Sequence, residues 1–224
     1  MPASRPLAGR SVAVFDAYGT LFDVHSAVAR HAAGIGPEAA RLSETWRAKQ
    51  LEYSWTLGLM GRRASFWTLT ERALDVALAQ HPRVDASLRE RLLDAYRDLD
   101  AYPEVPAVLQ ALGARGVRTA ILSNGDTVML ERAVAASGLD GRFDALLSVE
   151  AAGTFKTSPA AYRLVLDGLG VEPEAVAFVS SNRWDVAGAV AFGFAAIWVN
   201  RNGRPDEYLD LAPTQVVTSL DAIL

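Results

Sequence analysis

The sequence contains no cysteine among its 224 residues. This absence excludes disulfide bonds, thiolate zinc sites and cysteine nucleophiles, and it fits a chain of the reducing cytoplasm. Histidine is also scarce, because there are only three and none forms a close pair. A histidine metal site is therefore not expected.

Strong charge and long apolar runs are missing as well. The formal net charge is -4, and no cluster of Lys and Arg is longer than Arg62-Arg63, so the sequence carries no electrostatic signature of nucleic-acid binding. No stretch approaches the roughly 18 consecutive apolar residues of a membrane span, and residues 1–10 contain no apolar segment typical of a secretion signal. We expect a soluble, cytoplasmic protein that binds neither nucleic acids nor membranes.

What the chain does contain is enough apolar material for a full core, since half of its residues are hydrophobic. From Glu104 onward, strand-like apolar runs alternate with helical patterns, which is typical of βαβ units around a parallel sheet. The predicted strands are 118–122, 145–149, 176–179 and 195–199, and the predicted helices are 106–115, 128–137, 159–169 and 186–192.

The stretch between Phe22 and Tyr102 has a different rhythm. It shows no convincing strand but has helical periodicity over 38–57, 65–80 and 87–99. The simplest interpretation is a two-domain α/β protein: a core of residues 1–22 and 103–224, and a helical insert of residues 23–102. The insert carries an aromatic group, which we expect to form mainly its own core, with one or two rings lining a pocket over the sheet: Trp46, Tyr53, Trp55, Phe66 and Trp67.

The most informative motif is Asp16, which directly follows the apolar run Val12-Ala13-Val14-Phe15. A carboxylate at the carboxyl end of a buried parallel strand lies where open α/β sheets bind ligands. The following Gly19-Thr20 turn can direct backbone N–H groups toward an anion. The alternative is an aspartate that only caps the next turn.

Polar side chains follow three further segments of the predicted sheet. These are Ser123 and Asn124 after one strand, Lys156 in the loop before a helix, and a set after the strand at 176–179 that comprises Ser180, Asn182 and Asp185. Each alone is compatible with turn chemistry, helix capping or a solvated lysine. Because strand ends converge on one crevice in a doubly wound sheet, we expect these groups to meet Asp16.

The order of these residues resembles the haloacid dehalogenase superfamily, over essentially the whole chain. Most of that superfamily are magnesium-dependent phosphatases with a second Asp two residues after the nucleophile and two acids in the last motif. Here Tyr18 holds the first position, and the last motif has the single acid Asp185. Cleavage of a phosphate ester benefits from a general acid and a bound cation, whereas a halide leaves without a proton. These two differences from the phosphatase pattern favour displacement of a halide at carbon over cleavage of a phosphate ester.

At finer detail the chain resembles the L-2-haloacid dehalogenases, by residues 16–24, residues 46–53, Ser123-Asn124-Gly125, Phe155-Lys156 with Tyr162, and residues 180–185. The resemblance implies a Rossmann-like doubly wound core with a helical cap after strand one, no metal or cofactor, and commonly a homodimer. It implies hydrolysis of (S)-2-haloacids to (R)-2-hydroxyacids with inversion, through an ester on Asp16, with release of halide.

The resemblance also assigns a role to each matching residue. Asp16 would attack C2 of the substrate while Lys156 keeps it ionised, and Asp185, helped by Ser180, would activate the hydrolytic water. Arg47 with Asn182 would stabilise the departing halide. The remaining assignments are Ser123 and Asn124 for the substrate carboxylate, Thr20 and Tyr162 to position Asp16 and Lys156, and Tyr18, Leu51, Phe66 and Trp184 as apolar walls.

Several of these residues also have a purely structural interpretation. Arg47 taken alone suits a solvated helix face, Trp184 suits the core, and Thr20 and Tyr162 suit purely structural positions. Three positions differ from the common family pattern, namely Ala48 in place of Gln, Ser65 in place of Asp, and Thr157 in place of Pro. At the level of function, the alternatives are a magnesium-dependent phosphatase on the same fold and a non-catalytic domain that binds small carboxylates.

Overall fold

The computed structural model describes residue 7 and residues 9–224, so residues 1–6 and 8 of the expected core lie outside the described part. Its centre is a parallel sheet in the order β3-β2-β1-β4-β5-β6, which is the Rossmann order of a doubly wound fold. The strands are β1 (Val12–Phe15), β2 (Arg118–Ser123), β3 (Ala145–Ser148), β4 (Val176–Ser180), β5 (Ala195–Val199) and β6 (Gln215–Val217). The α/β prediction is confirmed.

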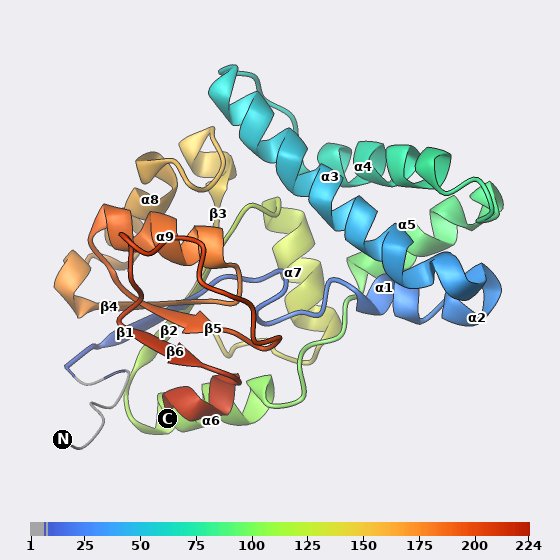
Figure 1. The fold of residues 1–224 in the computed structure, drawn as a ribbon. Coiled ribbons are helices and arrows are strands. Elements are labelled where there is room, and N and C mark those ends of the chain that lie inside the picture. The colour runs from blue at the N-terminus through green and yellow to red at the C-terminus, as the bar shows by residue number, and fades with distance from the viewer. Residues whose placement is uncertain (1–6, 8) are drawn as a thin grey trace.

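Helices cover both faces of this sheet. Alternate residues of each strand point to opposite faces, so Ala13 and Phe15 belong to one buried cluster and Val12 and Val14 to another. Helices α6 (Val105–Ala114) and α7 (Thr127–Ala136) pack on the first face, and α8 (Pro159–Leu169) and α9 (Arg183–Phe192) on the second. Figure 1 shows α8 and α9 above the sheet and α6 below it.

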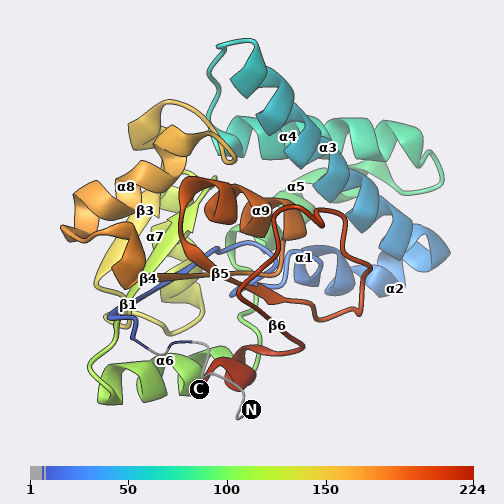
Figure 2. The same cartoon turned by 60° about the vertical axis from the view of Figure 1, so that its left-hand side comes forward.

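The helical insert forms a separate layer beside the sheet (Figure 1). It consists of α1 (Ser26–Ala29), α2 (Ala32–Ile35), α3 (Ala39–Leu59), α4 (Phe66–Gln80) and α5 (Arg89–Arg97). Trp46 is buried and its ring centroid lies 5.0 Å from that of Tyr96, so this aromatic belongs to the insert's own core as expected. In Figure 2 the insert lies above and to the right of α9, where Trp55 of α3 contacts Trp184 with 5.4 Å between ring centroids.

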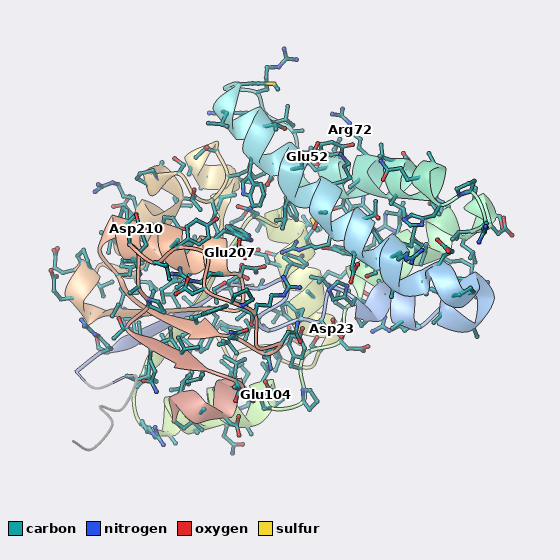
Figure 3. The ribbon with its side chains drawn as sticks, viewed as in Figure 1. Asp23, Glu52, Arg72, Glu104, Glu207 and Asp210 are labelled. Carbon is teal, nitrogen blue, oxygen red and sulfur yellow. The ribbon has the colours of Figure 1, made fainter. Side chains whose placement is uncertain are left out.

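Two chain segments join the insert to the core side by side. The backbone N–H of Asp23 donates to the carbonyl of Asp100 over 2.8 Å, and that of Tyr102 donates to the carbonyl of Leu21 over 2.9 Å. Figure 3 labels Asp23 at this junction and Glu104 shortly after it, at the start of α6. The short distance between entry and exit lets the insert leave β1 and return without disturbing the sheet.

The structure adds elements that the sequence pattern did not predict. These are the short helices α1 and α2, the strand β6, and the 3₁₀ turns Gly36–Glu38, Ala86–Leu88, Val149–Ala152, Pro173–Ala175 and Leu220–Ile223. Each spans three or four residues, which is too short for hydrophobic periodicity to register. Helix α9 also begins three residues earlier than expected. Within the described part of the chain, no helix has the length and apolar character needed to cross a bilayer.

Candidate active site

Asp16 sits where the order of strands reverses, between β1 and β4. Its backbone N–H donates to the carbonyl of Val179 over 2.9 Å, which continues the ladder and aligns Asp16 beside Ser180. The chain then turns at Gly19, whose φ of 90° strongly favours glycine. The carboxylate is thereby placed at the position where doubly wound sheets bind ligands.

Lys156 bridges Asp16 and Asp185. Its Nζ lies 3.1 Å from Asp16 Oδ1 and 2.7 Å from Asp185 Oδ2, and the exposed fractions of the Lys156, Asp16 and Asp185 side chains are 0%, 6% and 0%. Asn124 fixes the loop that carries the lysine, because its Oδ1 accepts the backbone N–H of Lys156 over 2.9 Å. Two carboxylates therefore share one buried cation.

Burial and charge act against each other within this triad. Burial disfavours the ammonium of Lys156, but attraction to Asp16 and Asp185 raises its pKa overall, so the lysine stays charged. Burial also raises the pKa of Asp185 to about 6, against the opposing attraction of Lys156. A carboxylate with a pKa near neutrality is a suitable proton acceptor.

The second oxygen of Asp16 is held by side chains of the turn and of the segment after β4. Asp16 Oδ2 accepts from Thr20 Oγ1 over 2.9 Å and from Asn182 Nδ2 over 2.8 Å. Thr20 Oγ1 in turn accepts the backbone N–H of Ser181 over 2.8 Å. The hydroxyl of Ser180 is farther away, 3.5 Å from Asp16 Oδ2. This set of donors fixes the orientation of the carboxylate.

Two of the expected contacts are arranged differently. Tyr162, expected to position Lys156, donates its hydroxyl to Asp185 Oδ1 over 2.8 Å instead, because α8 and α9 pack against each other. Burial raises the pKa of Tyr162 well above its usual value, so the hydroxyl remains a donor. Asn182, expected near the halide, directs its amide to Asp16 and to the carbonyl of Tyr18.

The loop after β2 supplies a buried donor without a partner. Ser123 Oγ accepts the backbone N–H of Gly125 over 3.1 Å, which tightens the turn. Asn124 uses its oxygen for Lys156, and its Nδ2 is buried without a hydrogen-bond partner among the residues that the structure describes. Buried polar groups are almost always paired, so this donor suits an anionic ligand.

The insert contributes Arg47 to the same region. The guanidinium is half-buried rather than solvated, and it donates to the carbonyl of Tyr18 over 3.2 Å and to Gln50 Oε1 over 2.7 Å. Gln50 is itself anchored, because its Nε2 donates to Thr70 Oγ1 over 2.6 Å. The arginine is thus brought from α3 to within hydrogen-bond reach of the loop that follows Asp16.

Aromatic rings enclose the loop after Asp16. The ring of Tyr18 stacks on Tyr96 at 5.9 Å, with 10° between their planes, and lies 6.2 Å from the ring of Phe66. Leu51 is half-buried on α3, one turn after Arg47. Trp184 is half-buried and borders a groove of about 650 Å³ that Lys156 also lines. It is therefore not a residue of the deep core.

Three residues of this region were missed by the sequence reasoning. Gln50 is part of the motif that singled out Arg47 and lies three residues after it, a spacing that places both on one helix face. Asp126 lies just after Ser123-Asn124-Gly125, but the sequence reasoning assigned it no role. Tyr96 carries no signal in the sequence, because its contact with Tyr18 depends on how the insert packs on the core. In residue 7 and residues 9–224, no group of three or more His, Asp or Glu side chains is arranged to hold a metal ion.

Comparisons with known proteins place this geometry in a family. Residues 11–193 match the model of haloacid dehalogenase-like hydrolases. The chain is 50% identical to (S)-2-haloacid dehalogenase 1 of Pseudomonas sp. (strain CBS-3) over 196 residues, covering 87% of this chain and 86% of the relative. It is 49% identical to (S)-2-haloacid dehalogenase 4A of Burkholderia cepacia over 201 residues, covering 89% and 87%.

A solved structure extends the likeness to three dimensions. The L-2-haloacid dehalogenase of Xanthobacter autotrophicus with chloropropionic acid covalently bound is 38% identical, has a TM-score of 0.86, and is matched over 94% of this chain and 95% of that one. A further dehalogenase structure, solved with an intermediate complex, is 45% identical with a TM-score of 0.93, over 95% of each chain. The protein belongs to the L-2-haloacid dehalogenase family of haloacid dehalogenase-like hydrolases.

Proposed function

We propose that this enzyme hydrolyses (S)-2-haloacids to (R)-2-hydroxyacids without a cofactor, through an ester on Asp16. The observation that carries the proposal is the buried bridge of Lys156 between Asp16 and Asp185, next to Tyr18 rather than a second acid. The bridge sets a buried ammonium against the proposed nucleophile and a second carboxylate nearby, while Tyr18 stands where the phosphatases of the superfamily have their second Asp.

In the first step, an oxygen of Asp16 attacks C2 of the substrate from the side opposite the halogen. The new C–O bond forms as the carbon–halogen bond breaks, and the halide leaves with the bonding electron pair. This inverts C2 and needs no proton. Asp16 Oδ1 suits the attack, because it accepts from Lys156 Nζ, whereas Thr20 and Asn182 both hold Oδ2.

In the second step, water attacks the carbonyl carbon of the ester rather than C2. Asp185 accepts a proton from this water, consistent with its pKa of about 6. Cleavage of the ester regenerates the Asp16 carboxylate and releases the hydroxyacid with the inverted configuration retained. The balance is one water consumed and one halide and one proton released.

Substrate recognition follows from the remaining groups. We propose that Asn124 Nδ2 and Ser123 donate to the substrate carboxylate and that Arg47 stabilises the halide. The buried, unpartnered Asn124 Nδ2 and the contact of Arg47 with the carbonyl of Tyr18 support these roles. The helical insert of residues 23–102 acts as the cap over the core of residues 1–22 and 103–224. We further propose that the protein is a cytoplasmic homodimer that binds a small 2-haloalkanoic acid.

The direct test measures chloride and proton release from L-2-chloropropionate in the presence of EDTA. The D enantiomer and para-nitrophenyl phosphate with magnesium serve as alternative substrates, and Asp16→Asn is the matched variant. We expect release from the L form alone, lost in Asp16→Asn. Cleavage of the phosphate ester with magnesium, without halide release, would instead identify a phosphatase.

The ester itself is tested by a single turnover in ¹⁸O-labelled water with enzyme in excess. Because water attacks the ester carbonyl, the label must enter the Asp16 carboxylate, where mass spectrometry of the peptide detects it. Label found only in the hydroxyacid would show that water displaces the halide directly and would contradict the proposed intermediate.

A further inference from the structure

The carboxylate of Asp126 connects the core to the helical insert. It occupies the N-terminal capping position of α7 in the core, yet both of its oxygens accept from α4 of the insert. The backbone N–H groups of Phe66 and Trp67 lie 2.7 Å from Oδ1 and Oδ2, respectively. Asp126 is 8% exposed, so this contact is largely shielded from water.

The arrangement departs from ordinary helix capping. An Asp at this position of α7 is expected to accept a hydrogen bond from its own helix. Here Glu150 does so instead, accepting from the backbone N–H of Thr127 over 2.7 Å and from its hydroxyl over 2.9 Å. The Asp126 carboxylate is thereby left available for another helix N-terminus.

The N-terminus of α4 is completed by this contact. The first N–H groups of a helix have no partner within the helix and carry its positive end. Ser65 satisfies only one of them with its side chain, that of Thr68, over 3.0 Å. Asp126 satisfies the N–H groups of Phe66 and Trp67, so an acceptor from the core finishes a helix of the insert.

The residue held in this way lines the candidate active site. The side chain of Phe66 is buried, and its ring lies 6.2 Å from that of Tyr18 and 6.2 Å from that of Phe155. Tyr18 is two residues after Asp16, and Phe155 directly precedes Lys156. Fixing the start of α4 therefore fixes an apolar wall between the two segments that carry the reacting carboxylate and its cation.

Cavities flank the contact on two sides. One of about 280 Å³ and another of about 330 Å³ are both lined by Asp126, Ser65 and Glu150. The hydrogen bonds of Asp126 thus lie beside two cavities, at the boundary between the core and the insert. A second tie from α7, between Arg132 and Asp98 at 2.7 Å, lies at a half-exposed place on the surface. Figure 1 shows α7 on the side of the core that faces the insert.

We propose that Asp126 is a positioning residue that latches the insert onto the core and sets Phe66 over the substrate. This inference rests on the proposed function, because it takes the pocket beside Asp16 as the substrate site. It adds a residue that acts through α4 and never contacts the reacting atoms. The latch controls how well substrate is bound, and leaves the carboxylate–lysine bridge untouched.

The test compares Asp126→Asn with Ser65→Ala. The amide of Asp126→Asn is nearly the same size as the carboxylate. It keeps one acceptor oxygen for one of the two N–H groups, those of Phe66 and Trp67, and turns an NH2 donor toward the second. Ser65→Ala removes a capping bond from the same helix end, with both partners inside the insert. Arg72 lies on the exposed side of α4, and Figure 3 shows it away from the core. Arg72→Gln therefore serves as the control for an exposed substitution on the same helix.

For L-2-chloropropionate, Asp126→Asn is expected to raise KM about tenfold, with a smaller change in kcat. Ser65→Ala is expected to lower Tm about as much as Asp126→Asn does, while its KM and kcat stay within about twofold of those of the parent enzyme. Asp126→Ala, which removes both acceptors, must move KM in the same direction. Equal KM values in Asp126→Asn and the parent, or equal effects of Asp126→Asn and Ser65→Ala, would overturn the proposal.

Hydrogen exchange tests the latch without relying on turnover. In Asp126→Asn, the amides of Phe66 and Trp67 and the facing core segment 149–155 should all exchange faster, whereas Ser65→Ala should affect α4 alone. Unchanged exchange in the core segment refutes the latch whatever the substrate is. Absence of halide release by the parent enzyme refutes the proposed function, and in that case the exchange data still decide whether Asp126 joins the two parts.

Discussion

Removing the buried cation at the centre of the site should destabilise the whole protein. Lys156→Met keeps an unbranched side chain of similar length but deletes the ammonium that lies 3.1 Å from Asp16 and 2.7 Å from Asp185. Two carboxylates would then face each other with almost no exposure to solvent. Because two buried carboxylates that both contacted the same ammonium cannot both remain ionised without it, one of them must take up a proton or the site must open to water.

The size of the effect follows from the burial of all three groups. Removing one partner of a buried ion pair costs about 3–5 kcal/mol, since it leaves a charge without compensation. For a chain of this length, each kcal/mol corresponds to a fall in Tm of about 2–4 °C, so the expected fall is about 6–20 °C at pH 8. Lowering the pH should reduce the difference in stability between Lys156→Met and the parent enzyme, because one of the two carboxylates is then protonated more readily.

Urea unfolding of the parent and of Lys156→Met at pH 8 and at pH 5 measures both effects. The double variant Lys156→Met/Asp185→Asn supplies the control, because it removes the cation together with one of its anions and should recover part of the loss. A loss below about 1 kcal/mol, or an equal loss at both pH values, would refute the reasoning, since neither fits a desolvated carboxylate pair.

Three further predictions concern single residues. Burial raises the pKa of Asp185 to about 6, so folding favours its protonated form. The contribution of Asp185 to the free energy of unfolding is therefore full below about pH 4 and falls by about 3 kcal/mol as the pH rises to 7. Urea unfolding should show this pH dependence in the parent enzyme, and Asp185→Asn should remove it. Single-turnover hydrolysis of the ester should speed up through the same pH range. Gln50→Leu removes one of the two acceptors of Arg47; it should raise KM about tenfold, measured by kinetics, and lower stability by about 1–3 kcal/mol, measured by calorimetry. Gly125→Ala would place a Cβ 2.6 Å from Tyr18 Cε2, and should cost about 1–3 kcal/mol in thermal unfolding and lower kcat/KM.

The sequence was sufficient to predict the core and the residues that meet at the candidate site. The apolar runs before Asp16 and before Ser180 mark buried parallel strands, and the structure pairs these strands directly. In this fold the carboxyl ends of the strands lie at one edge of the sheet, so the sequence alone predicts that Asp16, Lys156 and Asp185 lie close together. The helices of the insert followed from their periodicity.

What escaped prediction depends on which partner each polar atom finds. Tyr162 could be recognised as a supporting residue, but only the packing of α8 on α9 decides that its hydroxyl meets Asp185 and not Lys156. Asp126 precedes the predicted helix 128–137, and the sequence assigned it no role. Its actual partners belong to a helix 59 and 60 residues earlier, and no local pattern encodes that distance.

The central place of β1 in the sheet has a consequence for how the chain folds. Its neighbours are β2 and β4, so residue 12 pairs with residues 118 and 176, and both contacts close long loops. Folding slows as contacts become more distant in sequence. If the insert forms first through its own short-range helix contacts, Asp23 and Asp100 are brought together, and the loop that β1 and β2 must close becomes effectively short. During folding, the helical insert would then bring β1, the strand that precedes Asp16, close to β2 before the two strands pair.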